Sequence, residues 1–370
     1  MSTVADAMRV GRVRAHAYEI PTADDEESDG TLVWRATSVL VVEVEAGGAT
    51  GLGYGYCDAA AARIVERTLA GVVEGADALA PGEAWSKMQV AIRQLGQEGL
   101  AAMAASVLDI ALWDLKARLL GVALCDLLPR FRDAVPAYGS GGFTSYSERE
   151  LREQLGGWAA DGFRSVKMKV GREPARDPAR AAAARAAIGD EVELMVDANG
   201  AYRDVPQALA WAERFAGEHG VVWLEEPLSS RAVRGLRQVR ERAPAGLAIA
   251  AGEYAWTLAD CARLLDAAAV DVLQADVSRC GGITNLPRID GLCRARELPF
   301  SAHCVPAVMA HAGCALESLI HTEFFFDHAR AERLLFDGVV DPVDGLLRPD
   351  RSRPGLGIEL KRADAERWAA

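Results

Sequence analysis

The chain has 370 residues, 50 % of them hydrophobic and 25 % charged, and this composition excludes disordered, collagen-like and disulfide-scaffold proteins. Its net charge is −12 and it has no dense basic run, which excludes a surface that follows a nucleic-acid backbone. The length fits two domains, or one barrel with a large addition. Seven cysteines without a Cys-x-x-Cys pair, and a first segment without the apolar core of a secretory signal, predict a cytoplasmic protein with reduced thiols.

Residues 1–133 predict an α+β unit. Strand-like runs at 10–20 and 37–45 flank an acidic loop at 21–30, and Gly47-Gly48 signals a turn. Helical periodicity follows in three segments, 58–76, 83–95 and 100–120. A small antiparallel sheet followed by helices is the pattern of an α+β domain.

From residue 134 the sequence alternates short apolar runs with helical segments. Eight runs are found, at 135–140, 165–170, 192–197, 221–225, 247–252, 270–275, 299–303 and 323–326. Eight strands joined by helices are what a parallel (β/α)₈ TIM barrel requires. The last run is the weakest and fits a helix end equally well. The stretch 298–316 lacks charge, but its prolines and histidines predict a strand, a turn and a buried helix rather than a membrane span.

Ionisable residues close six consecutive runs at a regular spacing. They are Lys167 with Lys169, Asp197, Glu225, Glu253, Asp276 and His303. From Lys169 onward the steps are 28, 28, 28, 23 and 27 residues, which is the length of one strand, one helix and their loops. Side chains at the carboxyl ends of barrel strands converge at the mouth, so the spacing predicts a shared pocket.

Three of these residues predict a metal site. Asp197, Glu225 and Glu253 offer only oxygen ligands, which suit Mg²⁺ best, with Mn²⁺ as an alternative. A single such carboxylate is more simply a rim charge or a helix cap. Three at one mouth would repel one another without a cation among them. Of the pair Glu225-Glu226, we expect Glu225 to be the ligand and Glu226 to support it.

The remaining ionisable residues predict two acid–base groups. Lys167 and Lys169 are two residues apart and face the same side of their strand. Each is expected to lower the other's pKa, and a nearby metal to lower it further, so that one can act as a base near neutral pH. Asp276 and His303 close neighbouring strands, so a hydrogen bond between them is expected to raise the pKa of the histidine and fix its tautomer. Bases on two sides of a metal predict removal of the α-proton of a chelated carboxylate, through an enediolate.

The ordered motifs resemble the enolase superfamily, and within it the mandelate racemase group of the mandelate racemase/muconate lactonizing enzyme family. They are Lys167-Met168-Lys169, Asp197-Ala198-Asn199, Trp223-Leu224-Glu225-Glu226-Pro227, Ala251-Gly252-Glu253, Asp276 followed by Gly281-Gly282-Ile283-Thr284, and Ser301-Ala302-His303. The resemblance covers nearly the whole chain. It implies Asp197, Glu225 and Glu253 as Mg²⁺ ligands, Lys169 and the Asp276–His303 dyad as the two bases, and Lys167 as a contact of the substrate carboxylate.

The resemblance also implies further substrate contacts and a capping domain. Glu323 matches the acid that hydrogen-bonds the substrate carboxylate, although Asp327 and His328 lie close enough to compete, and Asn199 is a further contact. Loops at about 21–33 and 53–60 are expected to close over the substrate, with Tyr54, Tyr56 and Trp34 shaping the pocket or packing the cap. Most acidic residues of the first loop, Asp24, Asp25, Glu26, Glu27 and Asp29, are expected to be solvated.

The expected domains are a cap at 1–133, a barrel at 134–330 and a C-terminal tail at 331–370 that packs on the cap. The expected reaction is dehydration of an acid sugar, an aldonate or aldarate, to a 2-keto-3-deoxy acid. Racemisation or epimerisation of a 2-hydroxy acid is the alternative, and a non-catalytic binding protein on the same fold is a third. The expected partners are a small carboxylate substrate and copies of the chain in a dimer or octamer, without nucleic acid or membrane.

Overall fold

The computed structural model describes residues 8–24 and 26–370, and its N-terminal part contains a three-stranded antiparallel sheet. The sheet consists of β1 (Arg12–Pro21), β4 (Ala36–Ala46) and β5 (Ala49–Tyr56), in the order β1-β4-β5. The first two strands and the Gly47-Gly48 turn agree with the prediction, and both glycines have positive φ. β5 was not predicted, and it occupies the first half of the segment 53–60 that was expected to be a mobile loop. Residues 1–7 and Asp25 lie outside the described residues. The prediction that the chain has no secretory signal rests on residues 1–7.

Helices cover one face of this sheet. The segment predicted as a helix at 58–76 forms α2 (Ala60–Ile64), the π-helical η1 (Val65–Leu69) and α3 (Ala70–Val73). It is followed by α4 (Pro81–Ala91), the 3₁₀ turn η2 (Ile92–Gln94) and α5 (Leu100–Leu120). The long helix α5 is buried along most of its length and lies directly against β5, because Gly51 and Gly53 leave room for it. A Cβ atom on Gly53 would lie 2.2 Å from the carbonyl oxygen of Val107 in α5.

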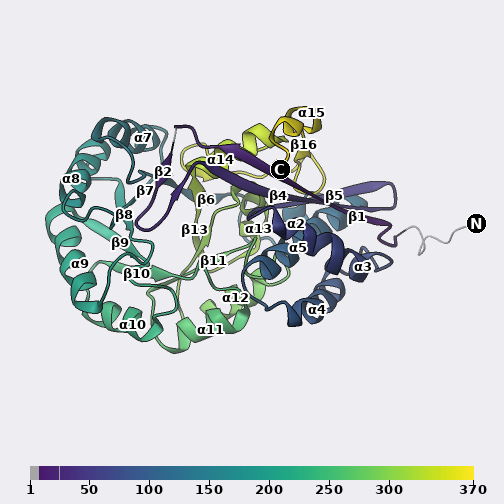
Figure 1. The fold of residues 1–370 in the computed structure, drawn as a ribbon, viewed down its shortest axis with the longest axis horizontal. Helices are drawn as coiled ribbons and strands as arrows, with labels where there is room; N and C mark the ends of the chain where they lie inside the picture. Colours follow the sequence, from purple (N-terminus) through teal and green to yellow (C-terminus); the bar gives the residue numbers. More distant parts are fainter. Residues whose placement is uncertain (1–7, 25) are drawn as a thin grey trace, which may run out of the picture.

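The predicted (β/α)₈ barrel is confirmed, with the cap beside it (Figure 1). Its strands are β6 (Val135–Gly141), β7 (Ser165–Lys169), β8 (Glu193–Asp197), β9 (Val221–Glu225), β10 (Ala248–Ala251), β11 (Val272–Asp276), β12 (Phe300–His303) and β13 (Leu319–Phe325). All pair in parallel with their sequence neighbours, and β13 pairs with β6 to close the barrel. The eighth run is therefore a strand rather than a helix end, and it begins four residues before the prediction.

Helices surround the barrel, one after each strand. They are α7 (Glu148–Ala160), α8 (Asp177–Ile188), α9 (Val205–His219), α10 (Val233–Arg242), α11 (Leu258–Asp266), α12 (Leu286–Arg294), α13 (Pro306–Ala312) and α14 (Phe326–Leu335). N-cap residues stabilise the first turns of three of these helices. Ser147 and Thr257 form capping boxes at α7 and α11, and Asp204 caps α9. The uncharged stretch 298–316 forms β12 and α13, as predicted. Among residues 8–24 and 26–370, no helix combines the length and apolarity needed to cross a bilayer.

The acidic segment that follows β1 forms a hairpin against the barrel. Its strands are β2 (Glu27–Ser28) and β3 (Val33–Trp34). Ser28 Oγ lies 2.7 Å from Thr144 Oγ1 at the end of β6, and a Cβ atom on Gly30 would lie 2.4 Å from the carbonyl oxygen of Ala198. Glu27 and Asp29 are buried, so the prediction that the loop is largely solvated holds for its other described acids and is wrong for these two.

The C-terminal segment links the barrel to the cap. Its strand β15 (Leu346–Leu347) pairs with β6 of the barrel, and its strands β14 (Phe336–Asp337) and β16 (Glu359–Leu360) pair with each other. Its Gly355 carbonyl accepts a hydrogen bond from α6 (Leu124–Leu127), the short helix that follows α5. The final turns are α15 (Arg362–Ala365) and η4 (Glu366–Trp368). Arg362 forms an ion pair with Glu43 of β4, and the Ala370 N–H donates to the Ala17 carbonyl at 3.0 Å. The domain boundaries after residues 133 and 330 stay predictions.

Candidate active site

The residues predicted for the site converge at one end of the barrel. The eight that are buried are Lys167, Lys169, Asp197, Glu225, Glu253, Asp276, His303 and Glu323. Five of them are the last residues of β7, β8, β9, β11 and β12. Lys167 lies two residues before the end of β7, Glu253 two residues after β10, and Glu323 within β13. Asn199 lies two residues after β8 with φ 46°, and its N–H donates to Asp197 Oδ1 at 2.9 Å. The parallel direction of all eight strands brings these side chains to the same mouth.

Both lysines form ion pairs with carboxylates from neighbouring strands. Lys167 Nζ lies 2.6 Å from Glu225 and 2.9 Å from Glu323, and Lys169 Nζ lies 2.6 Å from Asp197. Burial alone would lower the pKa of Lys167, but the carboxylates of Glu225 and Glu323 raise it well above its usual value. Burial would also lower the pKa of Lys169, but the carboxylate of Asp197 raises it, and the net shift is upward. Lys167 does lower the pKa of Lys169, as expected, but the carboxylate of Asp197 has the larger and opposite effect. The prediction that one of the lysines acts as a base beside a metal stays a prediction.

Glu225 and Glu226 are both buried, and both have raised pKa values. Burial, and then the neighbouring Asp197, raise the pKa of Glu225 to about 7. Burial, and then Glu253, raise the pKa of Glu226 well above its usual value. Glu225 Oε2 accepts from Trp223 Nε1 at 3.2 Å, whereas Glu225 Oε1 and Glu226 Oε1 are buried without a hydrogen-bond partner. Such orphaned carboxylate oxygens are stabilised by a cation.

The histidine is held between two carboxylates. His303 Nδ1 lies 2.8 Å from Asp276 Oδ2, and His303 Nε2 lies 2.6 Å from Glu253 Oε2. Asp276 Oδ1 in turn accepts from the N–H and Oγ of Ser278 at 2.7 and 2.6 Å. Burial alone would lower the pKa of His303, but its acidic neighbours, with Cys304 and Glu253 foremost, raise it well above its usual value. This direction agrees with the expectation from the sequence.

The three candidates for the substrate-carboxylate contact lie in different surroundings. Glu323 faces Lys167 and also lies 3.4 Å from His303 Nε2. Asp327 accepts from Trp34 Nε1 at 2.9 Å, at the edge of the cap. The ring of His328 stacks on Tyr56, with centroids 3.3 Å apart and an interplanar angle of 5°. Glu323 is thus the one that lies close to both Lys167 and His303.

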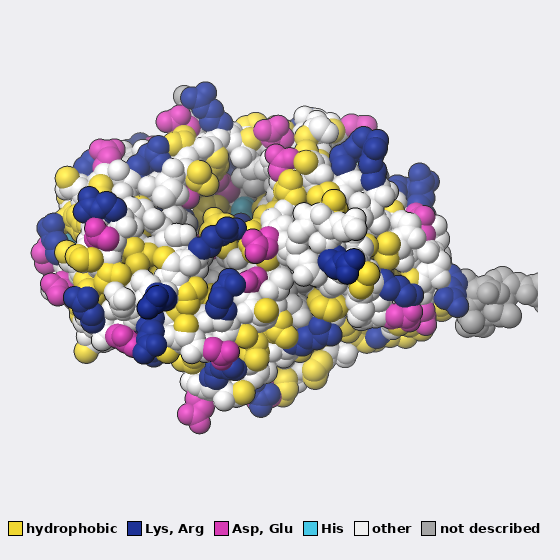
Figure 2. All heavy atoms as spheres, turned by 60° about the horizontal axis from the view of Figure 1, so that its bottom comes forward, with side chains coloured by type: hydrophobic (Ala, Val, Ile, Leu, Met, Phe, Trp, Pro, Cys, Tyr) yellow, Lys and Arg dark blue, Asp and Glu magenta, His cyan; other side chains and the backbone are white. Residues whose placement is uncertain are grey.

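A cavity of about 290 Å³ opens at this end of the barrel, and four of the predicted site residues line it. Its barrel side includes Lys169, Asn199, Glu253, His303 and Cys304, and its cap side includes Trp34, Thr37, Ser38, Tyr56 and Asp58. Figure 2 shows a hollow in this part of the surface, with histidine side-chain atoms inside it. A larger hollow of about 920 Å³ lies outside the site, next to the segment after β1, and is lined by none of the strand-end residues. Tyr54 is not part of the wall: it is fully buried and hydrogen-bonds to Glu332.

The charges at the mouth fit a divalent cation. Six carboxyl side chains lie there: Asp197, Glu225, Glu226, Glu253, Asp276 and Glu323. Four basic side chains face them: Lys167, Lys169, Arg279 and His303. Carboxyl groups thus outnumber basic groups at the mouth, which favours a cation among them. The carboxylate oxygens of Asp197, Glu225 and Glu253 are not all within 4.8 Å of one another. Asp197 and Glu225 form ion pairs with lysines, and Glu253 forms one with His303. A cation bound by all three carboxylates would replace these ion pairs.

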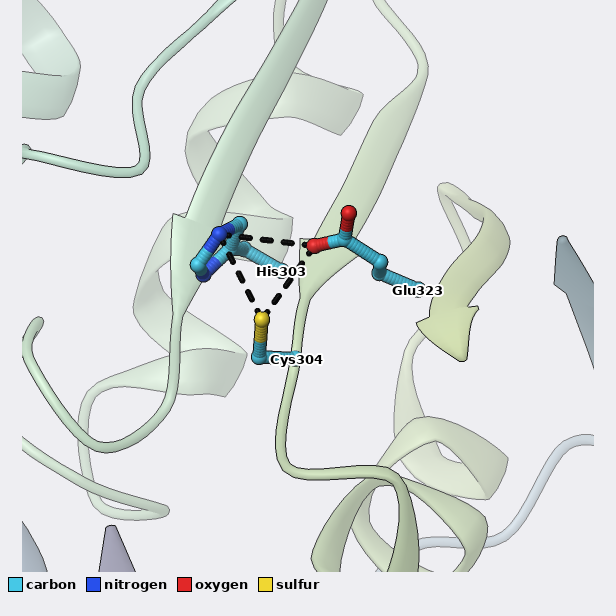
Figure 3. A group of neighbouring side chains, drawn as sticks. All are labelled: His303, Cys304 and Glu323. Carbon is cyan, nitrogen blue, oxygen red and sulfur yellow. Dashed lines mark hydrogen bonds and ion pairs between the residues drawn. The ribbon is translucent and has the colours of Figure 1, made fainter. Parts of the chain in front are cut away.

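Two residues at the mouth were missed by sequence reasoning. Arg279 packs its guanidinium on the ring of Tyr254 and lies 3.3 Å from Asp276. Cys304 lies between His303 and Glu323 (Figure 3). The available signal was position alone, because Cys304 directly follows the predicted histidine and Arg279 follows Asp276 by three residues.

Comparisons with known families and proteins agree with this geometry. Residues 30–129 match the family model "Mandelate racemase / muconate lactonizing enzyme, N-terminal domain", and residues 150–365 match "Enolase C-terminal domain-like". Among curated relatives, a 3,6-anhydro-alpha-L-galactonate cycloisomerase of Streptomyces coelicolor is 32 % identical, covering 95 % of this chain and 98 % of its own. An L-talarate/galactarate dehydratase of Salmonella typhimurium is 29 % identical, covering 90 % and 82 %.

Solved structures give the same result. A mandelate racemase/muconate lactonizing enzyme-like protein from Rubrobacter xylanophilus superimposes with a TM-score of 0.96 at 61 % identity, over 98 % of this chain and all of its own. A racemase from Streptomyces coelicolor A3(2), solved with bound magnesium, gives a TM-score of 0.90 at 31 % identity, over 98 % and 100 % of the two chains. Both similarities extend over the cap and the barrel together.

Proposed function

Because this chain belongs to the mandelate racemase/muconate lactonizing enzyme family of the enolase superfamily, we propose that it is a Mg²⁺-dependent enzyme that removes the α-proton of a small carboxylate substrate. The observation that carries this proposal is the shared cavity. Lys169 and His303 line it together, although they come from β7 and β12, which are not neighbours in the barrel. Two acid–base groups thus reach one bound molecule from separate directions.

Three oxygen donors are proposed to hold the metal: Asp197, Glu225 and Glu253. The excess of carboxylates and the unpaired Glu225 Oε1 support this assignment. When bound, Mg²⁺ supplies electrostatic stabilisation of the charge that develops on the substrate carboxylate. Once Asp197 and Glu225 engage a cation, they no longer stabilise the charged lysines as strongly. The pKa of Lys169 is then expected to fall toward the range in which an amine accepts a proton.

The proton transfers are assigned to the remaining residues. Lys169 is proposed to accept the α-proton, leaving an enediolate, while Lys167 and Glu323 hold the substrate carboxylate with Asn199 as a further contact. His303, oriented by Asp276, faces the cavity as the second acid or base. In a dehydration it gives a proton to the hydroxyl on the neighbouring carbon, which leaves as water, and the enol product becomes a 2-keto-3-deoxy acid.

We favour an acid sugar as the substrate and dehydration as the reaction. Polar groups from the cap, Thr37, Ser38 and Asp58, join Asn199 in the cavity wall and suit a chain of hydroxyl groups. Relatives named as acid-sugar dehydratases support the reaction type. Incubation with a library of aldonic and aldaric acids and Mg²⁺ should yield a semicarbazide-reactive keto acid. Failure of every acid in the library would count against dehydration.

The second candidate is an isomerisation. Two of the relatives are named as cycloisomerases and one solved neighbour as a racemase, and proton removal and return by the same two groups would serve both reactions. Exchange of the α-proton with solvent deuterium, without keto-acid formation, would favour a racemase or epimerase. A non-catalytic binding protein would gain support if calorimetry showed no Mg²⁺ binding to the wild type.

We also propose a cytoplasmic location and a homo-oligomer, a dimer or an octamer. The seven cysteines are free and buried, which suits a reducing compartment. The oligomer follows from the family resemblance, and light scattering after size-exclusion chromatography tests it.

A further inference from the structure

A thiol lies beside the catalytic groups and has no part in the proposed reaction. Cys304 Sγ is 3.4 Å from His303 Nε2 and 3.2 Å from Glu323 Oε2, and these two atoms are themselves 3.4 Å apart (Figure 3). Within residues 8–24 and 26–370, these three side chains form the group of at least three His, Cys, Asp or Glu residues whose possible ligand atoms all lie within 4.8 Å of one another. Sulfur, nitrogen and oxygen thus form a nearly equilateral triangle.

The triangle has the dimensions of one face of a zinc tetrahedron. With bonds of roughly 2.3 Å to sulfur and about 2.0–2.2 Å to nitrogen and oxygen, tetrahedral ligand atoms are separated by about 3.3–3.6 Å. The three separations between Cys304, His303 and Glu323 nearly match these values without rearrangement. Two of the three groups, His303 and Cys304, line the cavity, so a cation can reach them from solvent.

The surroundings hold the histidine as a ligand. His303 Nδ1 is engaged by Asp276 at 2.8 Å, so Nε2 is the nitrogen that faces the triangle, as in carboxylate–histidine–zinc sites. Nε2 also lies 2.6 Å from Glu253 Oε2, and a bound cation would replace this contact. Asp276 is itself held by two hydrogen bonds from Ser278. The thiol is fixed by the backbone, since Cys304 and Val305 have φ of 52° and 51°, a left-handed conformation that non-glycine residues adopt only when the surroundings enforce it.

We propose that Cys304, His303 and Glu323 bind a thiophilic divalent cation such as Zn²⁺. This site shares no ligand with the oxygen site assigned to Mg²⁺, but it adjoins it, because Glu253 lies 2.6 Å from His303 Nε2. Binding forms a metal–sulfur bond and releases the thiol proton to the solvent. The bound cation occupies His303 Nε2 and Glu323, so it inhibits turnover. The inhibition rests on the proposed function, whereas the binding does not.

Cobalt substitution tests the binding without a substrate. Titration of the wild type with Co²⁺ should produce a near-ultraviolet thiolate-to-metal charge-transfer band that saturates at about one Co²⁺ per chain. Cys304→Ser should lose the band, and Cys57→Ser should keep it, because Cys57 lines the same cavity outside the triangle. Co²⁺ held by oxygen ligands alone gives no such band. Its absence from the wild type, or its persistence in Cys304→Ser, would overturn the proposal.

Zinc affinity and diffraction provide further measurements. Displacement of Co²⁺ by Zn²⁺ should show at least a roughly 100-fold weaker affinity in Cys304→Ser, because loss of a ligand exceeds the roughly 10–100-fold cost of losing an outer-shell partner. If Cys304→Ser does not fold, anomalous diffraction from wild-type crystals soaked in Zn²⁺ decides. A peak bonded to Cys304 Sγ supports the proposal, and a peak only among Asp197, Glu225 and Glu253 contradicts it.

Inhibition is measured separately. Zn²⁺ should block α-proton exchange in the wild type, and Cys304→Ser should need a roughly 100-fold higher concentration, in line with its lost ligand. Equal sensitivity of both proteins would contradict the inhibitory role. Lack of exchange with every acid tried, with a normal Co²⁺ band, would overturn the proposed function and leave the metal site established.

Discussion

Asp276 accepts a hydrogen bond from His303 Nδ1 at 2.8 Å, and this contact turns the other ring nitrogen toward the cavity. The carboxylate fixes the tautomer and orientation of the imidazole and favours its charged form. Asp276 is therefore a positioning residue in the proposed reaction. Its own partners, the N–H and Oγ of Ser278, keep it from rotating away.

We expect Asp276→Asn to lower kcat by roughly 10²–10⁴-fold, the scale of an acid–base contribution. Because the hydrogen bond to Asp276 helps to raise the pKa of His303, the limb of the pH–rate profile that reports His303 should move to lower pH. Ser278→Ala, which leaves the carboxylate in place, should show a smaller loss and little shift. An unshifted profile in Asp276→Asn would show that the dyad does not set this pKa.

Lys169→Ala and His303→Asn should each abolish turnover without unfolding the protein. Each group is assigned a proton transfer, so neither loss can be compensated by the other. Turnover, α-proton exchange in deuterium oxide and melting temperature should be measured on the same samples. A large fall in melting temperature would instead indicate that the ion pair of Lys169 with Asp197, or of His303 with Glu253, is mainly structural.

Mg²⁺ should raise the stability of the folded chain, by about 2.7 kcal/mol at 100 times its dissociation constant. Chelation should remove activity, and added Mg²⁺ should restore it. Glu225→Gln should weaken Mg²⁺ binding in calorimetry, whereas the control Glu153→Gln, which alters an exposed carboxylate of α7, should leave it unchanged. Unaltered binding in Glu225→Gln would remove Glu225 from the ligand set.

Glu332 should make stability fall as pH rises from about 4.5 to about 7. Burial raises its pKa from 4.5 to about 7, against hydrogen bonds from Tyr54 and Tyr56 that lower it. The native state then binds the proton more tightly than the unfolded chain, so the native state is penalised when the proton is lost. Relative to the wild type, Glu332→Gln should gain about 3 kcal/mol between pH 4.5 and 8. Urea unfolding of both proteins at the two pH values measures this gain, and a constant difference would contradict the raised pKa.

Gly53→Ala should destabilise the cap, because a Cβ there would meet the Val107 carbonyl at 2.2 Å. Overpacking of this kind costs about 1–3 kcal/mol or more. Gly71→Ala in α3 is the matched control, since nothing lies within 4 Å of its added Cβ. That change should stabilise the protein by about 0.4–1 kcal/mol. Thermal or chemical unfolding distinguishes the two, and equal effects would contradict the close approach of β5 and α5.

The barrel could be predicted because its signal is repeated. Each strand-end residue recurs after one strand and one helix, so the convergence of Lys169, Asp197 and Glu225 followed from spacing alone. β5 was missed because Gly51, Gly53 and Gly55 look like a loop, whereas they are required by the helix packed against them. That requirement exists only in three dimensions.

The electrostatics of the site could not be predicted from neighbouring residues. Lys167 and Lys169 are adjacent in the strand, which indicated mutual repulsion, but the carboxylates that determine their pKa come from β8, β9 and β13. Cys304 gave only the signal of its position after His303, because its other partner, Glu323, is nineteen positions away. Both outcomes depend on contacts between strands that no local pattern contains.

The hairpin of β2 and β3 has a consequence for how this enzyme can diverge. It supplies Asp29 and Trp34 to the cavity wall but none of the residues assigned to proton transfer. Hydrogen bonds anchor it to the barrel, among them those of Ser28 with Thr144 and of Trp34 with Asp327. Mutation in this short segment can therefore change which substrates are accepted while the reaction is inherited intact, so hairpin exchange between relatives offers a route to engineered specificity.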